Sequence, residues 1–282
     1  MENFLISIQD FVQFEFLLYA LVATVLLALT CALISPLIIA RKNSFIGAAI
    51  SHSTLLGLAI ALTITNVEND FFVLFITVFV TMILTSFLAI SKNNKTPDDS
   101  KLGIFYTATM ALGILIYSLG SNQKNNLINF LFGNILLLNK FDLFISLGIF
   151  LFCFATILIP LKQWLFVTID PVGAEARRYQ LKKYQIIFYL LMTLVIVTSV
   201  KLAGTILIET MLLTPGFFAL NFARSIKQTF LYSLLFALFT APLGLVLANF
   251  LSLPSGATLA VVQFTVLILG FGLKFISQKI RV

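Results

Sequence analysis

Long apolar runs separated by short polar stretches dominate the chain. The runs fall at residues 15–40, 45–66, 70–90, 102–120, 142–161, 184–200, 203–222, 229–251 and 256–276. Most of them reach the roughly 20 residues that a helix needs to cross the hydrocarbon core of a bilayer. The pattern therefore predicts an all-α membrane protein, a polytopic bundle of about nine transmembrane helices with eight as the alternative. We expect these helices to form one transmembrane domain over residues 1–282.

A shorter apolar stretch, at 128–138, stands between two of these runs. It has too few residues to cross a bilayer, and backbone at membrane depth must find its hydrogen bonds within the protein. We therefore expect one short re-entrant or interfacial segment there, in addition to the spanning helices.

Composition supports a membrane protein and excludes several other classes. Hydrophobic residues make up 60% of the chain and charged residues 10%, whereas a soluble domain carries about 25% charged residues. The net charge of +7 does not indicate nucleic acid as a partner, because the basic residues fall in short clusters between apolar runs rather than on one basic surface. The sequence contains no GxxxxGK[ST], GxSxG or HExxH motif, so we do not expect an enzyme.

The distribution of basic residues predicts the orientation in the membrane. With nine spans and a cytoplasmic C-terminus, all 18 lysines and arginines except Lys124, Lys140 and Lys201 fall in the inside loops. Cytoplasmic loops carry such an excess of Lys and Arg. We therefore predict that the N-terminus lies outside and the C-terminus inside.

The inside loop at 170–183 has the features of a short helix on the membrane surface. Asp170 suits the N-cap and Pro171 the first helical position, and an acidic residue precedes the basic ones, as the helix dipole favours. Two interpretations are open. The loop is either a solvated segment that only enforces topology, or a docking element for a cytoplasmic partner.

Two ionisable side chains lie deep within predicted spans, where such groups are costly and indicate functional sites. His52, the single histidine, lies roughly 15 Å from Lys42 at the inner edge, and Glu209 lies roughly 12 Å from Lys201 at the outer edge. Both therefore lie near the middle of a core about 30 Å thick. An imidazole and a carboxylate at one depth can bind a divalent metal, relay a proton or pair with each other.

The spans that carry these two residues also contain signals for helix contacts. Around His52, small residues recur every four positions and predict close helix packing in lipid; they are Ala49, Ser53, Gly57 and Ala61. The span of Glu209 is interrupted at Pro215 and Gly216, where the proline removes a backbone hydrogen bond. This gives either a kink or a broken helix of the kind that lines substrate paths in transporters.

Five segments in order along the chain resemble one known family. They are 46–57 (IGAAISHSTLLG), 99–103 (DSKLG), 130–134 (FLFGN), 203–216 (AGT through LLTPG) and 253–257 (LPSGA). In this order they resemble the membrane permease subunits of bacterial ABC importers for zinc, manganese and iron. The resemblance covers nearly the whole chain. Leu56 stands where manganese-type permeases often have Pro, so the chain looks most similar to the zinc-uptake permeases.

The resemblance implies what the protein does and with which partners. It implies a permease in the bacterial cytoplasmic (inner) membrane that translocates zinc, with manganese or iron as alternatives, and that holds no permanently bound cofactor. It also implies separate cytoplasmic ABC ATPase subunits that hydrolyse ATP, an extracytoplasmic metal-binding protein and a homodimer of permeases surrounded by membrane lipid. We expect the metal path to include His52, Glu209, Ser51 and Thr205. The resemblance implies the role of His52, whereas Glu209 is unusual for the family at its position and is included for its depth in the span. The ATPase-coupling residues would be Asp170, Ala174, Glu175, Arg177 and Arg178, the last standing where the family often has Gly.

One position departs from the family pattern. Ala48 stands where the second-helix motif usually has Asp, four residues before His52. A lone imidazole is a poor site for a dication, because the charge of the ion is left uncompensated. Glu209 would supply the missing carboxylate from another helix; the alternative is that Glu209 is protonated and hydrogen-bonded to a neighbouring helix. A stand-alone secondary transporter, in which the two residues relay protons, is the second functional class.

Overall fold

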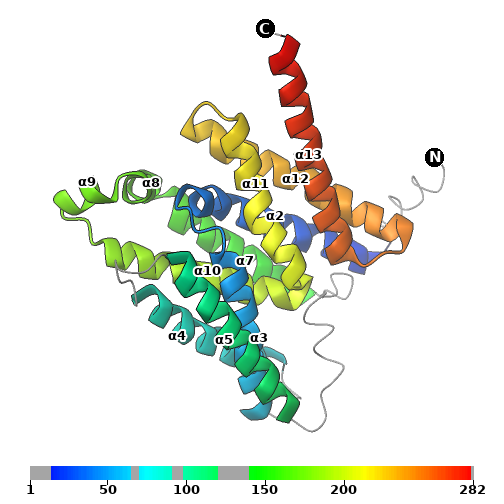
Figure 1. Ribbon diagram of the computed structural model, residues 1–282. Helices are drawn as coiled ribbons and strands as arrows, with labels where there is room; N and C mark the ends of the chain where they lie inside the picture. Colours follow the sequence, from blue (N-terminus) through cyan, green and yellow to red (C-terminus); the bar gives the residue numbers. More distant parts are fainter. Residues whose placement is uncertain (1–13, 65–69, 91–97, 120–139, 281–282) are drawn as a thin grey trace.

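The computed structural model describes residues 14–64, 70–90, 98–119 and 140–280, and this part of the chain is helical throughout apart from short turns (Figure 1). The long helices are α2 (Glu15–Ala40), α3 (Ile46–Ile64), α4 (Asp70–Ile90), α5 (Asp98–Leu119), α7 (Lys140–Leu158), α10 (Leu181–Ala203), α11 (Thr205–Phe222), α12 (Ile226–Leu251) and α13 (Ser255–Ile280). Within the described residues, these nine are long and apolar enough to cross a membrane. The predicted all-α bundle of nine spans is therefore confirmed. The expected re-entrant segment at 128–138 lies outside the described residues.

The centre of the bundle is α2, which packs against α7, α11 and α12. Every residue from Thr30 to Ile38 is buried, so this part of α2 faces protein on all sides, whereas its first half also carries exposed residues such as Phe16 and Leu18. Polar bonds between helices support this packing: the Ser233 hydroxyl of α12 donates to the Ala32 carbonyl of α2 at 2.7 Å. Helices α4, α5 and α13 lie at the periphery, and their candidate spans are mostly unburied. Apolar side chains on these outer faces suit contact with lipid.

The turn between α10 and α11 consists of one residue. Gly204 has φ 80° and ψ 163°, a conformation that is essentially restricted to glycine. Because there is no longer loop, the end of α10 and the start of α11 are held next to each other. This turn fixes the position of α11 along its own axis relative to α10.

Two short helices, α8 (Leu161–Ile169) and α9 (Pro171–Ala176), follow α7 and lie together at one edge of the bundle (Figure 1). Helix α8 buries Trp164, whose indole N–H donates to the Thr156 carbonyl at 2.9 Å. Helix α8 was not predicted from the sequence, because its apolar stretch is too short to span a membrane. A short apolar stretch containing a tryptophan next to a span is the signal that would have indicated an interfacial helix.

Candidate functional site

Helices α3 and α11 bring His52 and Glu209 together inside the bundle. The His52 Nε2 atom lies 3.4 Å from Glu209 Oε1. The side chains keep 16% and 31% of their surface exposed, respectively, so the pair is not sealed in a dry core. Two residues that are far apart in the sequence, and that the sequence places at similar depths, thus form one polar site.

Ser51 is the second contact of the same carboxylate. Its hydroxyl lies 2.7 Å from Glu209 Oε1 and 3.0 Å from the Ala48 carbonyl, and can donate to either oxygen. Ser51 is fully buried, so its position is fixed by the packing of α3. The carboxylate is therefore oriented toward α3 by a hydroxyl and an imidazole on adjacent residues.

Tyr106 of α5 belongs to the site, although the sequence reasoning did not identify it. Its ring lies 4.6 Å from the His52 ring, centroid to centroid, with the planes at 80°. The imidazole thus contacts an aromatic ring as well as the Glu209 carboxylate. The contact depends on how α5 is rotated against α3, which hydrophobic runs do not reveal. Tyr106 stands near the start of the span, which also contains Phe105 and a second phenol at Tyr117, so the sequence did not single it out.

The structure places Thr205 at the first position of α11, one helical turn before Glu209. Thr205 is buried, with 2% of its surface exposed. Residues four apart in a helix lie on the same face, so Thr205 and Glu209 share a face of α11. Thr205 therefore lies one helical turn from Glu209 on the same face of α11.

All four small residues of the stripe on α3 are buried. At Gly57 a β-carbon would lie 2.6 Å from Thr81 Oγ1 of α4, so α3 and α4 approach closely there. From the other side, a β-carbon at Gly113 of α5 would lie 2.9 Å from the backbone nitrogen of Leu56. The helix that carries His52 is thus held between α4 and α5 by close backbone contacts.

The chain does not break at Pro215, as one interpretation of the sequence expected. Helix α11 continues through Pro215 from Thr205 to Phe222. Just after the proline, the Gly216 N–H donates to Ser35 Oγ of α2 at 2.8 Å, and the Ser35 hydroxyl donates to the Leu213 carbonyl at 3.4 Å. Backbone groups around a proline in a span can be satisfied in this way by a serine of a neighbouring helix.

The donor set limits what the site can hold. Within the described part of the chain, no three His, Cys, Asp or Glu side chains come together in a group able to bind a metal ion. One imidazole, one carboxylate and a serine hydroxyl can hold a dication only with further oxygen ligands such as water. Such an incomplete site suits an ion that passes through, because a conducted ion must also be able to leave.

The predicted surface helix at 170–183 is shorter in the structure than the sequence suggested. The Asp170 carboxylate accepts the Gly173 N–H at 2.9 Å and Pro171 occupies the first turn, as expected for a capped start. Helix α9 nevertheless ends at Ala176, because Arg178 adopts φ 62°. That left-handed conformation ends helices and favours glycine.

The side chains of α9 divide between the bundle and the surface. Ala174 is fully buried, whereas Glu175, Arg177 and Arg178 are exposed. The guanidinium of Arg177 lies 5.2 Å from the Phe166 ring centroid of α8. The described helix is therefore anchored to α8 and presents charged side chains outward.

Comparison with known proteins places these features in a family. The manganese import permease ScaB of Streptococcus gordonii is 31% identical, with 97% of each chain covered. The manganese transport membrane protein MntC of Halalkalibacterium halodurans is 30% identical over 99% of this chain and 93% of its own length. The zinc uptake protein ZnuB of Haemophilus influenzae is 26% identical over 88% and 94%. The expected likeness to zinc permeases in particular is thus weaker than the likeness to manganese permeases.

The fold and the family agree with these relatives. The structure of PsaBC from Streptococcus pneumoniae, solved in complex with Fab, matches with a TM-score of 0.82 at 28% identity, covering 94% of each chain. The model of the ABC 3 transport family matches residues 13–274. The chain therefore belongs to the ABC 3 transport family and is a multi-pass transmembrane subunit of a bacterial ABC metal importer, in which the ATPase is a separate subunit.

Proposed function

We propose that this permease imports manganese, and that the ion crosses the membrane past His52, Glu209 and Ser51. The observation that carries the proposal is the contact between the imidazole and the carboxylate, 3.4 Å apart in the bundle interior. Ionisable groups inside membrane spans are costly and usually serve a function. Their joint presence is best accounted for by a cationic substrate.

The ligand chemistry favours manganese over zinc. The site combines one nitrogen with a carboxylate and a hydroxyl, and oxygen donors suit Mn²⁺. Structural zinc sites usually draw on several Cys or His side chains, but His52 is the only histidine of the chain. The relatives that are 30% and 31% identical carry manganese in their names, which supports the same choice.

Zinc is the second candidate cargo. Imidazole is a good zinc ligand, and a zinc uptake protein is 26% identical to this chain. The resemblance to the family also favoured zinc, because Leu56 stands where manganese-type permeases often have Pro. The two metals differ in coordination: Zn²⁺ is usually bound by four ligands, whereas Mn²⁺ binds more ligands and prefers oxygen.

The partners follow from the same proposal. ABC ATPase subunits would dock at α9, where Glu175, Arg177 and Arg178 are exposed. An extracytoplasmic metal-binding protein would deliver the ion to the opposite side, and two permeases would form the transport unit. ATP binding and hydrolysis on the partner would supply the free energy, because the chain has no P-loop motif of its own.

The proposal is tested with the complete importer, permease and ATPase together, reconstituted in liposomes with the metal-binding protein outside. We expect ATP-dependent uptake of manganese that an equal concentration of zinc does not suppress. Faster uptake of zinc than of manganese would overturn the choice of cargo. Uptake by the permease alone on a proton gradient would instead support a secondary transporter.

A further inference from the structure

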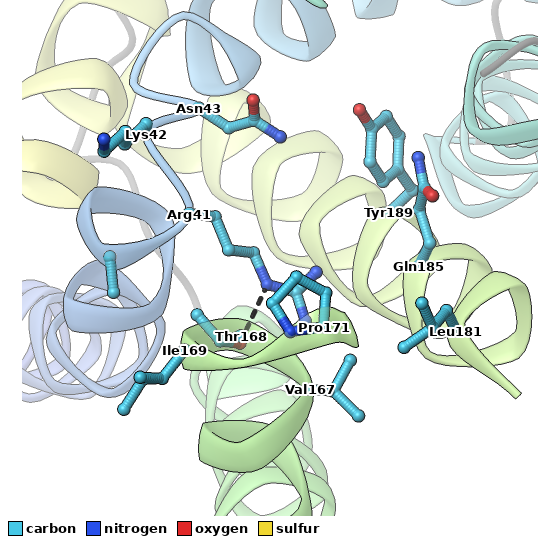
Figure 2. Close-up of a pocket in the computed structure, with 11 residues that line it drawn as sticks. Arg41, Lys42, Asn43, Val167, Thr168, Ile169, Pro171, Leu181, Gln185 and Tyr189 are labelled. Carbon is cyan, nitrogen blue, oxygen red and sulfur yellow. Dashed lines mark hydrogen bonds between the residues drawn. The ribbon is translucent and has the colours of Figure 1, made fainter. Parts of the chain in front are cut away.

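A cavity of about 360 Å³ lies where the end of α2 meets the junction of α8 and α9 and the first turns of α10 (Figure 2). Its polar side chains come from three separate segments; they are Arg41, Lys42, Asn43, Thr168, Gln185 and Tyr189. The cavity is on the side of the membrane that the basic residues assign to the cytoplasm. None of the residues that line it belongs to the site formed by His52, Glu209 and Ser51.

Arg41 reaches into this cavity with an unsatisfied guanidinium. Its Nε–H donates to Thr168 Oγ1 at 3.2 Å, drawn as the dashed line in Figure 2. Its central carbon lies 4.1 Å from the Phe188 ring centroid and 5.4 Å from that of Trp164. The Nη2 atom is buried and has no hydrogen-bond partner. Packing and one hydroxyl therefore position the group and leave part of its donor capacity unused.

The positive charge of Arg41 also lacks a counter-charge. Among the residues that the structure describes, no carboxylate lies at ion-pair distance from Arg41. Burial lowers the pKa of Arg41 to about 10, so the guanidinium still carries its charge at neutral pH. Arg41 as a whole is half-buried, but leaving its buried Nη2 donor without a partner is unfavourable. An anion in the cavity would remove this cost.

The position of the cavity relative to the bilayer indicates which anion. Arg41 directly follows the last residue of the spanning helix α2, which is the depth of lipid headgroups. The wall contains aliphatic side chains as well as polar ones, and one of them, Ile169, is 65% exposed. On the same side Ile159, at the end of α7, is 83% exposed. Exposed isoleucines at this depth are suited to lipid chains.

We propose that this cavity binds the phosphate of an anionic phospholipid from the cytoplasmic leaflet, with Arg41 as its main ligand. Arginine donates paired hydrogen bonds to phosphate oxygens, and Nη2 is the free donor. Basic pockets between spanning helices on the cytoplasmic side suit such headgroups. The bound lipid would tie the end of α2 to the α8–α9 junction. The alternative occupant, an acidic side chain of the ATPase, would have to reach down to the level at which the span ends.

The test uses the full-length permease, delipidated in detergent, and counts bound lipid by native mass spectrometry. We expect phosphatidylglycerol to bind more tightly than phosphatidylcholine. Arg41→Gln should weaken phosphatidylglycerol binding by about tenfold or more, because it removes charged hydrogen bonds. The matched control is Lys162→Gln, which removes a basic side chain exposed on α8 outside the cavity; it should bind as the parent does.

A second variant keeps the proposal testable if Arg41→Gln folds poorly. Lys42→Gln removes a charge at the rim of the cavity, where the side chain is exposed, and should weaken binding by about threefold, since a charge near the surface contributes less. Unchanged lipid binding in both variants would overturn the proposal. So would binding of inorganic phosphate without phosphatidylglycerol, or loss of the co-purifying ATPase in Arg41→Gln with lipid binding intact.

Discussion

At the scale of single residues, α11 approaches α2 closely where Gly216 meets Ser35. A β-carbon at Gly216 would lie 2.5 Å from the carbonyl carbon of Ser35 and 2.7 Å from its carbonyl oxygen. These are backbone atoms, which cannot move aside alone. The contact lies two turns along α11 from Glu209, so it positions the helix that carries the candidate ligand.

Gly216→Ala should therefore destabilise the protein by about 1–3 kcal/mol, the usual cost of overpacking, and lower its melting temperature in detergent. Gly148→Ala on α7 is the matched control, because nothing lies within 4 Å of a β-carbon built there. It should be neutral or stabilise by up to about 1 kcal/mol. Equal melting temperatures for the two variants would show that α2 and α11 do not approach as closely as described.

At the scale of elements, α9 combines a tight cap with an exposed outer face. The first turn is capped by Asp170, and the helix is anchored by buried Ala174. Val172, in contrast, is 79% exposed. An exposed apolar side chain on a short helix that also carries exposed charges suits docking into a groove of a partner. Arg178 has a left-handed backbone conformation, which glycine adopts at no steric cost.

The double variant Glu175→Lys with Arg178→Glu should reverse the charges that α9 offers to the ATPase. Both side chains are exposed, so we expect normal insertion and melting temperature. ATP hydrolysis should then proceed without metal uptake, measured in the same liposomes. Thr240→Val, which removes a hydroxyl that bonds within α12, serves as a control with normal coupling. Normal uptake by the double variant would show that α9 is not the docking element.

The elements that could be predicted from the sequence are those whose signal is local. Spans follow from apolar length, so α2 and α11 were predicted to within a few residues. Depth along a span follows from helical rise, which is how His52 and Glu209 could be matched. Rotation of one helix against another depends on tertiary packing, so the contact with Tyr106 could not be predicted. The end of α9 depends on one backbone angle, at Arg178, that its residue type does not favour.

At the scale of the whole molecule, the described helices form one bundle with α2 at its centre and α8 and α9 at one edge (Figure 1). The candidate ion site lies inside the bundle, whereas the candidate ATPase contact and the Arg41 cavity lie at that edge. Under the proposed function, this arrangement separates the path of the ion from the surface that contacts the ATPase. It requires that α9 face the cytoplasm.

Orientation can be tested with single cysteines. In a background lacking Cys31 and Cys153, both of which are buried, Lys227→Cys should react with a membrane-impermeant maleimide only from the cytoplasmic side. Lys124→Cys should react only from outside, because the excess of basic residues assigns it to an outer loop. Labelling of both positions from one side would refute the predicted topology and the assignment of α9 to the cytoplasm.

The central claim is that Glu209 supplies the carboxylate that Ala48 lacks, and metal uptake by a set of substitutions tests it most directly. If Glu209 binds the ion, Glu209→Ala and Glu209→Gln should both lower ATP-driven manganese uptake by about tenfold or more, since each loses a charged ligand. Adding Ala48→Asp to Glu209→Ala should restore part of the uptake, because the new carboxylate lies one turn from His52. Uptake at the parent rate in Glu209→Ala, or uptake retained in Glu209→Gln alone, would contradict the claim.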